Sequence, residues 1–586
     1  MLRSSRALVS LIRSLTFGTA ATLAVATLAT SVVGCKDESQ PEYWVDKLDD
    51  AQWRARAVQR LEQFFEDSLT RANKDTQNPD VQALLNKVVD PLTKTYVNNY
   101  SELDTKTRVS LIKVLASFRD KRTEPALKKA FDEFAKKPAT QKDDADIKWA
   151  ARAVSDLKLA SLGDSLLQAF LKLKAHTMLG GIAYKDLNEA MLAMPQPNWG
   201  GPLRSALEPP IVAPTGKADA AEKLDDYRDQ LFWQTTAAEV LGVLQDSAAV
   251  EPLLKITLDP AKADVHPTAL LALVKIGKPA ADRAVKLLKG EDKALVEFAG
   301  RRIQELTKAK EAPKDRPYVP VAALVLGTIG RPESIGAMVS VLRTEDKEIN
   351  KAVIARELTK IPATPQSKEA FKAAFEGISL DATVPPGANA LQMLAEAAGT
   401  FYDPGMIDWL LGRAEATRGA GDDKKALQSA ITVTVLKLAK PGQLASAKRA
   451  VAAYGTQLEK DLYAQVEKLL KACGDRASCY LVEVEKGENQ DQKNQFAGIK
   501  AAYMIAMLGN EQSRDELIQR LDAIENAAVR FSSAAAIDYL SPKGSKDAAA
   551  KLKSIITKNK QSADSNKIQG DAPLKHVMYR IESRAG

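Results

Sequence analysis

The stretch AAEVLGVLQDSAAVEPLLKI, residues Ala237–Ile256, decides the fold class of this chain. Its first half places apolar residues at helical spacing and ends at Gly242, a residue expected to take the left-handed conformation that closes a helix. The polar turn Gln245–Ser247 follows, and helical spacing resumes from Ala248. The stretch therefore predicts two antiparallel helices joined by a short turn.

The same pattern returns along most of the chain. Apolar runs that predict the second helix of a pair end near these positions: Phe64, Phe118, Leu159, Met194, Gly242, Gly277, Gly330, Ile361, Gly399, Ala439, Gly474, Gly509 and Leu540. The intervals 242–277, 439–474 and 474–509 are 35 residues each, and longer intervals hold insertions. Self-similarity at a fixed period indicates a repeat array, in which each pair buries its apolar face against its neighbours. We therefore expect about 11–13 stacked helix pairs.

These repeats resemble HEAT repeats. The segments that carry the resemblance are WRARAVQRLEQF, AAEVLGVLQDSAAVEPLL, VAALVLGTIGRPESIGAMVSVL and AAYMIAMLGNEQSRDELIQRL. As in that family, an apolar helix with small residues ends in a Leu-Gly-like turn, here followed by Lys278-Pro279 or Arg331-Pro332. The Trp, Gly, Tyr and Pro positions of tetratricopeptide units do not recur. The resemblance, which covers most of residues 42–558, implies an all-α, right-handed α-solenoid.

Segments that interrupt the repeats suggest how the chain is organised. The proline-rich stretch 195–222 cannot form one helix and should hold a short helix near 203–207 and a long loop. The basic, proline-bearing stretch 307–320 is expected to be a linker. We expect a signal peptide (1–34), a tether (35–42), N-terminal repeats (43–194), an insertion (195–222), further repeats (223–306), a linker (307–320), C-terminal repeats (321–558), and a polar tail with a capping helix (559–586).

The N-terminus has the pattern of an export signal: basic residues up to Arg13, then the uncharged, mostly apolar run Leu15–Val33. The sequence Val-Val-Gly-Cys at 32–35 resembles a bacterial lipobox, which implies that Cys35 is lipidated and becomes the first residue of the mature protein. An uncleaved anchor helix is the alternative. Lys36, rather than Asp, resembles the pattern that directs enterobacterial lipoproteins to the outer membrane. We expect an exported chain facing the periplasm, with surface exposure left open.

Two further cysteines, Cys473 and Cys479, lie in CGDRASC at a helix–turn–helix junction. Exported proteins usually pair their thiols, and the ends of such a junction come within the distance that a disulfide spans. A structural disulfide is therefore expected. Free thiols and a redox-active pair are the alternatives, although the spacing differs from Cys-x-x-Cys and no βαβ pattern surrounds the pair.

Motifs for catalysis, metals and cofactors do not stand out. The sequence lacks a glycine-rich phosphate loop, a G-x-S-x-G motif and HExxH, and its three histidines are far apart: His176, His266 and His576. We expect no catalytic residue, no metal and no cofactor. The net charge of +8 falls to +5 without the three leader arginines, and both signs are interspersed, so a solvated surface is expected rather than nucleic-acid binding.

A long helical array offers an extended face that suits a protein or peptide partner. The sequence therefore predicts a non-catalytic, membrane-tethered scaffold or adaptor in the bacterial envelope, monomeric on its own. A structural subunit of a multi-protein envelope assembly is a second reading, and a HEAT-like lyase-type enzyme is a third. Trp199, in the proline-rich insertion, is the one aromatic residue considered for partner contact, with packing between repeats as the alternative.

Overall fold

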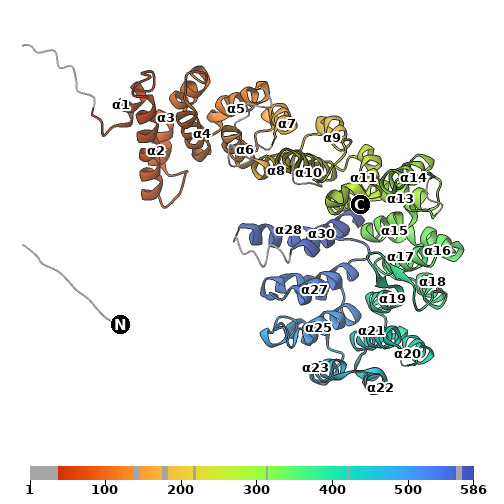
Figure 1. Cartoon of the computed structure of the whole chain (residues 1–586). Coiled ribbons are helices and arrows are strands. Elements are labelled where there is room, and N and C mark those ends of the chain that lie inside the picture. The colour runs from red at the N-terminus through yellow and green to blue at the C-terminus, as the bar shows by residue number, and fades with distance from the viewer. Residues whose placement is uncertain are drawn as a thin grey trace, which may run out of the picture. The chain divides into compact units, whose positions relative to one another are not determined.

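The chain is almost entirely helical. The computed structural model describes residues 37–137, 144–174, 183–214, 220–311, 315–419, 421–561 and 571–585, which excludes Cys35 and the signal segment. Within these ranges the strands form one two-stranded hairpin, β1 (Thr383–Val384) with β2 (Ala388–Asn389). The predicted all-α helical-repeat fold is confirmed (Figure 1). The handedness of the solenoid stays a prediction.

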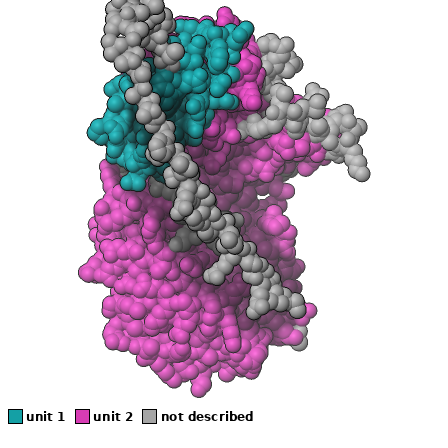
Figure 2. Space-filling view, turned by 90° about the vertical axis from the view of Figure 1, so that its left-hand side faces the viewer, with its two compact units in different colours: residues 1–88 teal, residues 89–586 magenta. Residues whose placement is uncertain are grey.

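The chain divides into two compact units, residues 1–88 and 89–586, which Figure 2 shows in teal and magenta. The described part of unit 1 holds α1 (Pro41–Asp46), α2 (Arg54–Arg71) and the first half of α3 (Pro79–Asn98), within which the boundary falls. Trp44 anchors α1 on α2, and its indole N–H donates to the carbonyl oxygen of Glu38 at 2.8 Å.

Unit 2 contains the remaining helices. The α-helices are α4 (Thr105–Phe118), α5 (Glu124–Lys136), α6 (Ala145–Leu157), α7 (Gly163–Lys172), α8 (Tyr184–Ala193), α9 (Gly200–Ala206), α10 (Ala220–Val243), α11 (Val250–Leu258), α12 (His266–Ile276), α13 (Lys278–Leu288), α14 (Lys293–Thr307), α15 (Tyr318–Ile329), α16 (Ile335–Thr344), α17 (Glu348–Leu358), α18 (Pro365–Glu376), α19 (Ala390–Ala398), α20 (Ile407–Ala416), α21 (Asp422–Leu438), α22 (Leu444–Tyr454), α23 (Gln457–Cys473), α24 (Ala477–Glu483), α25 (Gln495–Leu508), α26 (Glu511–Arg520), α27 (Ala527–Tyr539), α28 (Lys546–Gln561) and α30 (Ala572–Arg584). Short 3-10 helices join them: η1 (Lys121–Thr123), η3 (Ala160–Leu162), η4 (Pro197–Trp199), η5 (Ser247–Ala249), η6 (Pro260–Val265), η7 (Pro332–Ser334), η8 (Gly399–Phe401), η9 (Pro404–Met406), η10 (Pro441–Gln443), η11 (Gly487–Asn489) and η12 (Leu521–Ala523).

Equivalent helices of successive pairs pack on one another. The stacked neighbours include α10 with α12, α15 with α17, α19 with α21 and α25 with α27. Helix α15, whose sequence is YVPVAALVLGTI, is buried over most of its length. Helices α12 and α13 cover α15 on one side, and α17 covers it on the other. A helix that is covered on both sides needs apolar residues around most of its surface.

The first helix of the opening stretch continues past the residue expected to end it. Helix α10 includes Gly242 and ends at Val243, and the left-handed residue of the turn is Gln245, with φ of 51°. A Cβ atom on Gly242 would lie 2.8 Å from the Cα atom of Ala272, so glycine permits close packing of α10 on α12. The expected left-handed closure is seen instead at Gly330, where φ is 69°.

The interruptions predicted from proline lie between helices. After η4 and α9, the insertion runs without helix to residue 214, and α10 begins at Ala220. A second break separates α14, which ends at Thr307, from α15, which begins at Tyr318. The last helix, α30, packs on α27 and α28 and also on α12, which lies some 300 positions earlier in the chain. It therefore joins two distant parts of unit 2 (Figure 1).

Candidate functional site

Helix α30 is held to the middle of the array by hydrogen bonds to backbone carbonyls. Nη2 of Arg580 donates to the carbonyl oxygen of Lys360 at 2.5 Å, and Nη1 of Arg331 donates to that of Ser583 at 2.7 Å. Lys360 follows the end of α17, and Ser583 lies in the last turn of α30. The last carbonyl groups of a helix have no hydrogen-bond donor within that helix. Each arginine thus caps the end of a helix far away in sequence.

The start of α30 is fixed to the C-terminal part of the array. The guanidinium of Arg530 in α27 forms a buried ion pair with Asp571 at 2.7 Å, and Asn559 in α28 donates to the same carboxylate at 3.1 Å. One helix therefore fastens α27 and α28 to α12, α15 and α17, and the array closes on itself.

A glycine makes room for this closure. Gly330 follows α15 in the left-handed conformation, and a Cβ atom placed on it would lie 1.9 Å from Nη2 of Arg580. Any larger residue would displace the guanidinium. Glycine at position 330 thus permits both the left-handed backbone conformation and the contact of Arg580 with Lys360.

Closure creates a cavity of about 380 Å³, which we call the seam pocket. Residues from five places surround it: α15, the segment after α17, η8 with the residue that follows it, α27 and α30. Its apolar lining includes Ile361, Phe531 and Val577. Two phenol rings, Tyr402 and Tyr539, pack against each other in a tilted arrangement with centroids 4.7 Å apart. Burial raises the pKa of both phenols, so they keep their protons at neutral pH.

Charged side chains form another part of the lining. Asp538 in α27 pairs with Arg580 at 3.2 Å and also with Arg584. Burial alone would raise the pKa of Asp538, but the two guanidiniums outweigh it and hold the pKa below its usual range. Asp538 is therefore ionised, and two positive charges share one negative charge.

His576 lines the same pocket from α30. Its Nε2 lies 2.9 Å from the carbonyl oxygen of Thr328, and because a carbonyl only accepts, Nε2 carries the hydrogen. Burial lowers the pKa of His576 to about 4, and the charge of Arg580 adds to the shift. The imidazole is neutral at pH 7. Its contact with Thr328 positions α30, and its low pKa makes the imidazole a weak base.

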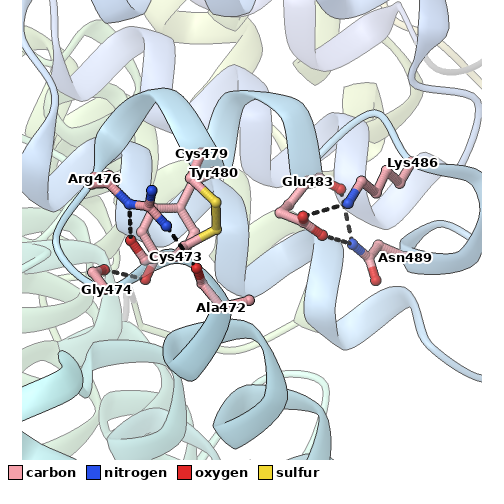
Figure 3. Close-up of a disulfide and its surroundings, with 9 residues drawn as sticks. All are labelled: Ala472, Cys473, Gly474, Arg476, Cys479, Tyr480, Glu483, Lys486 and Asn489. Atoms are coloured by element: carbon pink, nitrogen blue, oxygen red, sulfur yellow. Dashed lines mark hydrogen bonds and ion pairs between the residues drawn. A yellow bond between two sulfur atoms is a disulfide. The ribbon is translucent and has the colours of Figure 1, made fainter.

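The second feature predicted from sequence is the cysteine pair. The sulfur atoms of Cys473 and Cys479 lie at bonding distance, 1.96 Å, and join the end of α23 to α24 (Figure 3). Tyr480 donates to the carbonyl oxygen of Gly474 at 2.6 Å and holds the turn beside the bond. The predicted structural disulfide agrees with this geometry.

One carboxylate near the disulfide could suggest a metal site. Ligand atoms of Cys473, Cys479 and Glu483 lie within 4.8 Å of one another. Bonded sulfurs offer no thiolate, however, and Glu483 accepts from Lys486 at 2.5 Å and from Asn489 at 3.0 Å (Figure 3). The arrangement serves the junction of α24 with η11 and gives no reason to expect a metal.

Other residues singled out in the sequence have structural surroundings. Trp199, the candidate for partner contact, is fully buried, which favours the alternative of packing between repeats. Nε2 of His266 bonds to the carbonyl oxygen of Asp259 at 3.0 Å. Cys35 and His176 lie outside the described residues. In the part of the chain that is described, no helix is long and apolar enough to cross a membrane.

Sequence reasoning did not find the seam pocket. Its residues belong to α15, α27 and α30 and to the segments around the end of α17 and η8, and no repeat period relates α30 to α15. A signal was present in PLKHVMYRIESR, where Leu574, Val577 and Ile581 form an apolar stripe beside two arginines. Buried arginines need partners, and this helix offers no acid at a suitable position to pair them.

Comparisons with known proteins show only distant likeness. No protein-family model and no curated protein matches the chain. Among solved structures, an engineered protein is 14% identical, with 93% of this chain and 99% of that chain covered and a TM-score of 0.22. The crystal structure of Uso1-2 is 12% identical, with 91% and 90% covered and a TM-score of 0.29.

Proposed function

We propose that this chain is a membrane-tethered, non-catalytic scaffold or adaptor of the bacterial envelope, and that a protein or peptide partner docks at the seam pocket. The observation that carries the proposal is the exposure of Phe531. Its side chain lines an apolar cavity and is nevertheless 61% exposed. A large exposed aromatic beside an apolar cavity of this size is typical of a binding surface.

The lining supports a partner that inserts an apolar side chain. Ile361, Val577 and the methyl groups of Ala534 and Ala535 offer an apolar wall next to Phe531. The phenols of Tyr402 and Tyr539 keep their protons and can donate to a peptide carbonyl. Apolar walls with a few placed donors are the usual composition of sites that bind peptide groups.

Photo-crosslinking in cells tests the docking site. A benzoylphenylalanine at position 531 should trap a discrete partner, whereas the same residue at Leu458 should not. Leu458 is a matched control, because it is 62% exposed and lies on α23, away from the pocket. Equal labelling at the two positions, or none at position 531, would count against docking at the seam pocket.

Membrane tethering is tested separately. The proposal rests on the lipobox-like Val-Val-Gly-Cys at 32–35. Cys35→Ser should move the protein from the membrane to the soluble fraction, because a lipid that is attached to the thiol can no longer be added. Unchanged fractionation would exclude a lipid tether at this cysteine and leave an uncleaved anchor helix.

A further inference from the structure

The charged side chains of the seam pocket indicate which class of ligand it prefers. Two guanidiniums, Arg580 and Arg584, share the carboxylate of Asp538. Lys360, also in the lining, pairs with Glu357 at 2.7 Å and shares that carboxylate with Arg356. With His576 neutral, these groups comprise four cations and two carboxylates, so two positive charges are in excess.

One nitrogen of each guanidinium also lacks a hydrogen-bond acceptor in the described part of the chain. Nε of Arg580 and Nη1 of Arg584 are buried and have no acceptor among the described residues. The side chains are only 5% and 2% exposed, so bulk water does not make up for the missing bonds. A buried donor without an acceptor is unfavourable, and a charged donor more so. The excess positive charge of the lining favours an incoming anion, and the enclosed donors show that the fold leaves the two guanidiniums incompletely hydrogen-bonded.

We propose that the seam pocket binds the C-terminal residue of a peptide, with its carboxylate beside Arg580 and Arg584 and its apolar side chain against Phe531. This proposal rests on the proposed partner docking and names the group that docks. An α-carboxylate and a side chain on one carbon are the combination that a cavity of about 380 Å³ with one cationic and one apolar part accommodates. Carboxylates are among the anions that guanidiniums bind through paired hydrogen bonds.

Binding of this residue also stabilises the docked position of α30. Arg580, Arg584 and Val577 belong to α30, whereas Ile361 follows α17 and Phe531 belongs to α27. The ligand therefore contacts three segments that meet only when α30 is docked. By thermodynamic linkage, a ligand that prefers the docked helix must favour closure by the same factor as closure favours the ligand.

A pair of probes tests the chemistry with the full mature chain. N-acetyl-L-phenylalanine carries the carboxylate and the apolar ring, and its amide lacks only the charge. Ligand-observed NMR titration should show saturable binding of the acid at least tenfold tighter than that of the amide. Equal affinities, or no saturable binding of the acid, would overturn the proposal. Tighter binding of decanoate than of the acid would assign the site to a fatty acid instead.

Two substitutions address separate parts of the site. Arg584→Gln should abolish the preference for the acid over the amide, and Ala535→Phe should weaken both probes by filling the cavity without altering a charge. Circular dichroism establishes that each variant is folded, and Leu458→Ala is the control expected to bind like the parent. A preference that survives Arg584→Gln, or binding unaffected by Ala535→Phe, would contradict this site.

Hydrogen exchange gives a readout of closure. The acid should slow amide exchange across residues 572–584, and the amide should have little effect at the same concentration. Protection that is equal for both probes would overturn the coupling of the carboxylate to α30. Crosslinking at position 531 remains an independent measure of partner docking, so failure of the carboxylate probe and failure of the proposed function are distinguishable.

Discussion

Nη2 of Arg580 lies 2.5 Å from the carbonyl oxygen of Lys360, a residue 220 positions earlier in the chain. The same side chain pairs with Asp538 in α27 at 3.2 Å. One guanidinium therefore links α30 to two other parts of the array, where the chain would otherwise end as an open stack. Closure, and with it the seam pocket, depends on this contact and a few like it.

Removal of that guanidinium should open the array. Arg580→Ala should lower the free energy of unfolding or of α30 docking by roughly 2–4 kcal/mol, because it removes the donor to the carbonyl oxygens of Lys360 and Gly327 and leaves Asp538 with one guanidinium in place of two. The control is Arg418→Ala, whose side chain is 67% exposed in its pair with Glu415 and should cost less than about 0.5 kcal/mol. Denaturant titration gives both values, and equal effects would show that Arg580 does not hold the closure.

Gly330→Ala should be destabilising in a way that depends on Arg580. The left-handed conformation costs alanine about 1 kcal/mol, and the clash with the guanidinium adds to it. In the Arg580→Ala background only the conformational cost should remain. A double-mutant cycle by denaturant unfolding measures the difference. Strict additivity of the two substitutions would mean that the close approach does not strain the folded protein.

Docking of α30 should weaken in acid through His576. Its pKa is about 4 when α30 is docked, and should return to its usual value near 6.5 when the helix is released. Because the docked state disfavours the proton, docking is unaffected above about pH 6.5 and loses about 1.4 kcal/mol per pH unit as the pH falls towards 4. The groups facing His576 are Arg580, Asp538 and Lys360, of which Asp538 stays ionised in this range because its pKa is lowered.

Hydrogen exchange of residues 572–584 at pH 7.5 and pH 5, corrected for intrinsic rates, measures this effect. His576→Gln is the control, since glutamine can donate to Thr328 but does not titrate. The parent should lose about 2 kcal/mol more protection than the variant over this range. The same pH dependence in both proteins would assign the effect to other groups.

Loss of the disulfide should have a modest effect. The bond joins residues six positions apart, so it restricts the unfolded chain little, and Cys473→Ser with Cys479→Ser should cost about 2 kcal/mol. Alkylation followed by mass spectrometry checks the bond itself: without reductant neither cysteine should be labelled, and with reductant both should be. Labelling before reduction would show free thiols.

The repeat array could be predicted because its cause is local. Periodic apolar residues and turn residues define each helix pair, and an equivalent pair follows next in the chain, so α10 packs on α12 and α25 on α27. The disulfide could be predicted for the same reason, since Cys473 and Cys479 flank one turn. The close packing of α12 on Gly242 could not be predicted, because a glycine that ends a helix and a glycine that makes room for a neighbouring helix look alike in sequence.

The sequence by itself therefore determined the helices, their pairing with near neighbours and the place of the disulfide, all of which depend on residues within about one repeat. Only the tertiary structure decided that Trp199 is interior and that α30 docks on α12, α15 and α17. A helical pattern shows which face of a helix is apolar, but not which distant surface covers it. Arg580 reaches the middle of the array through the carbonyl oxygens of Gly327 and Lys360, and because every residue carries a carbonyl oxygen, no residue type in the sequence marks these partners.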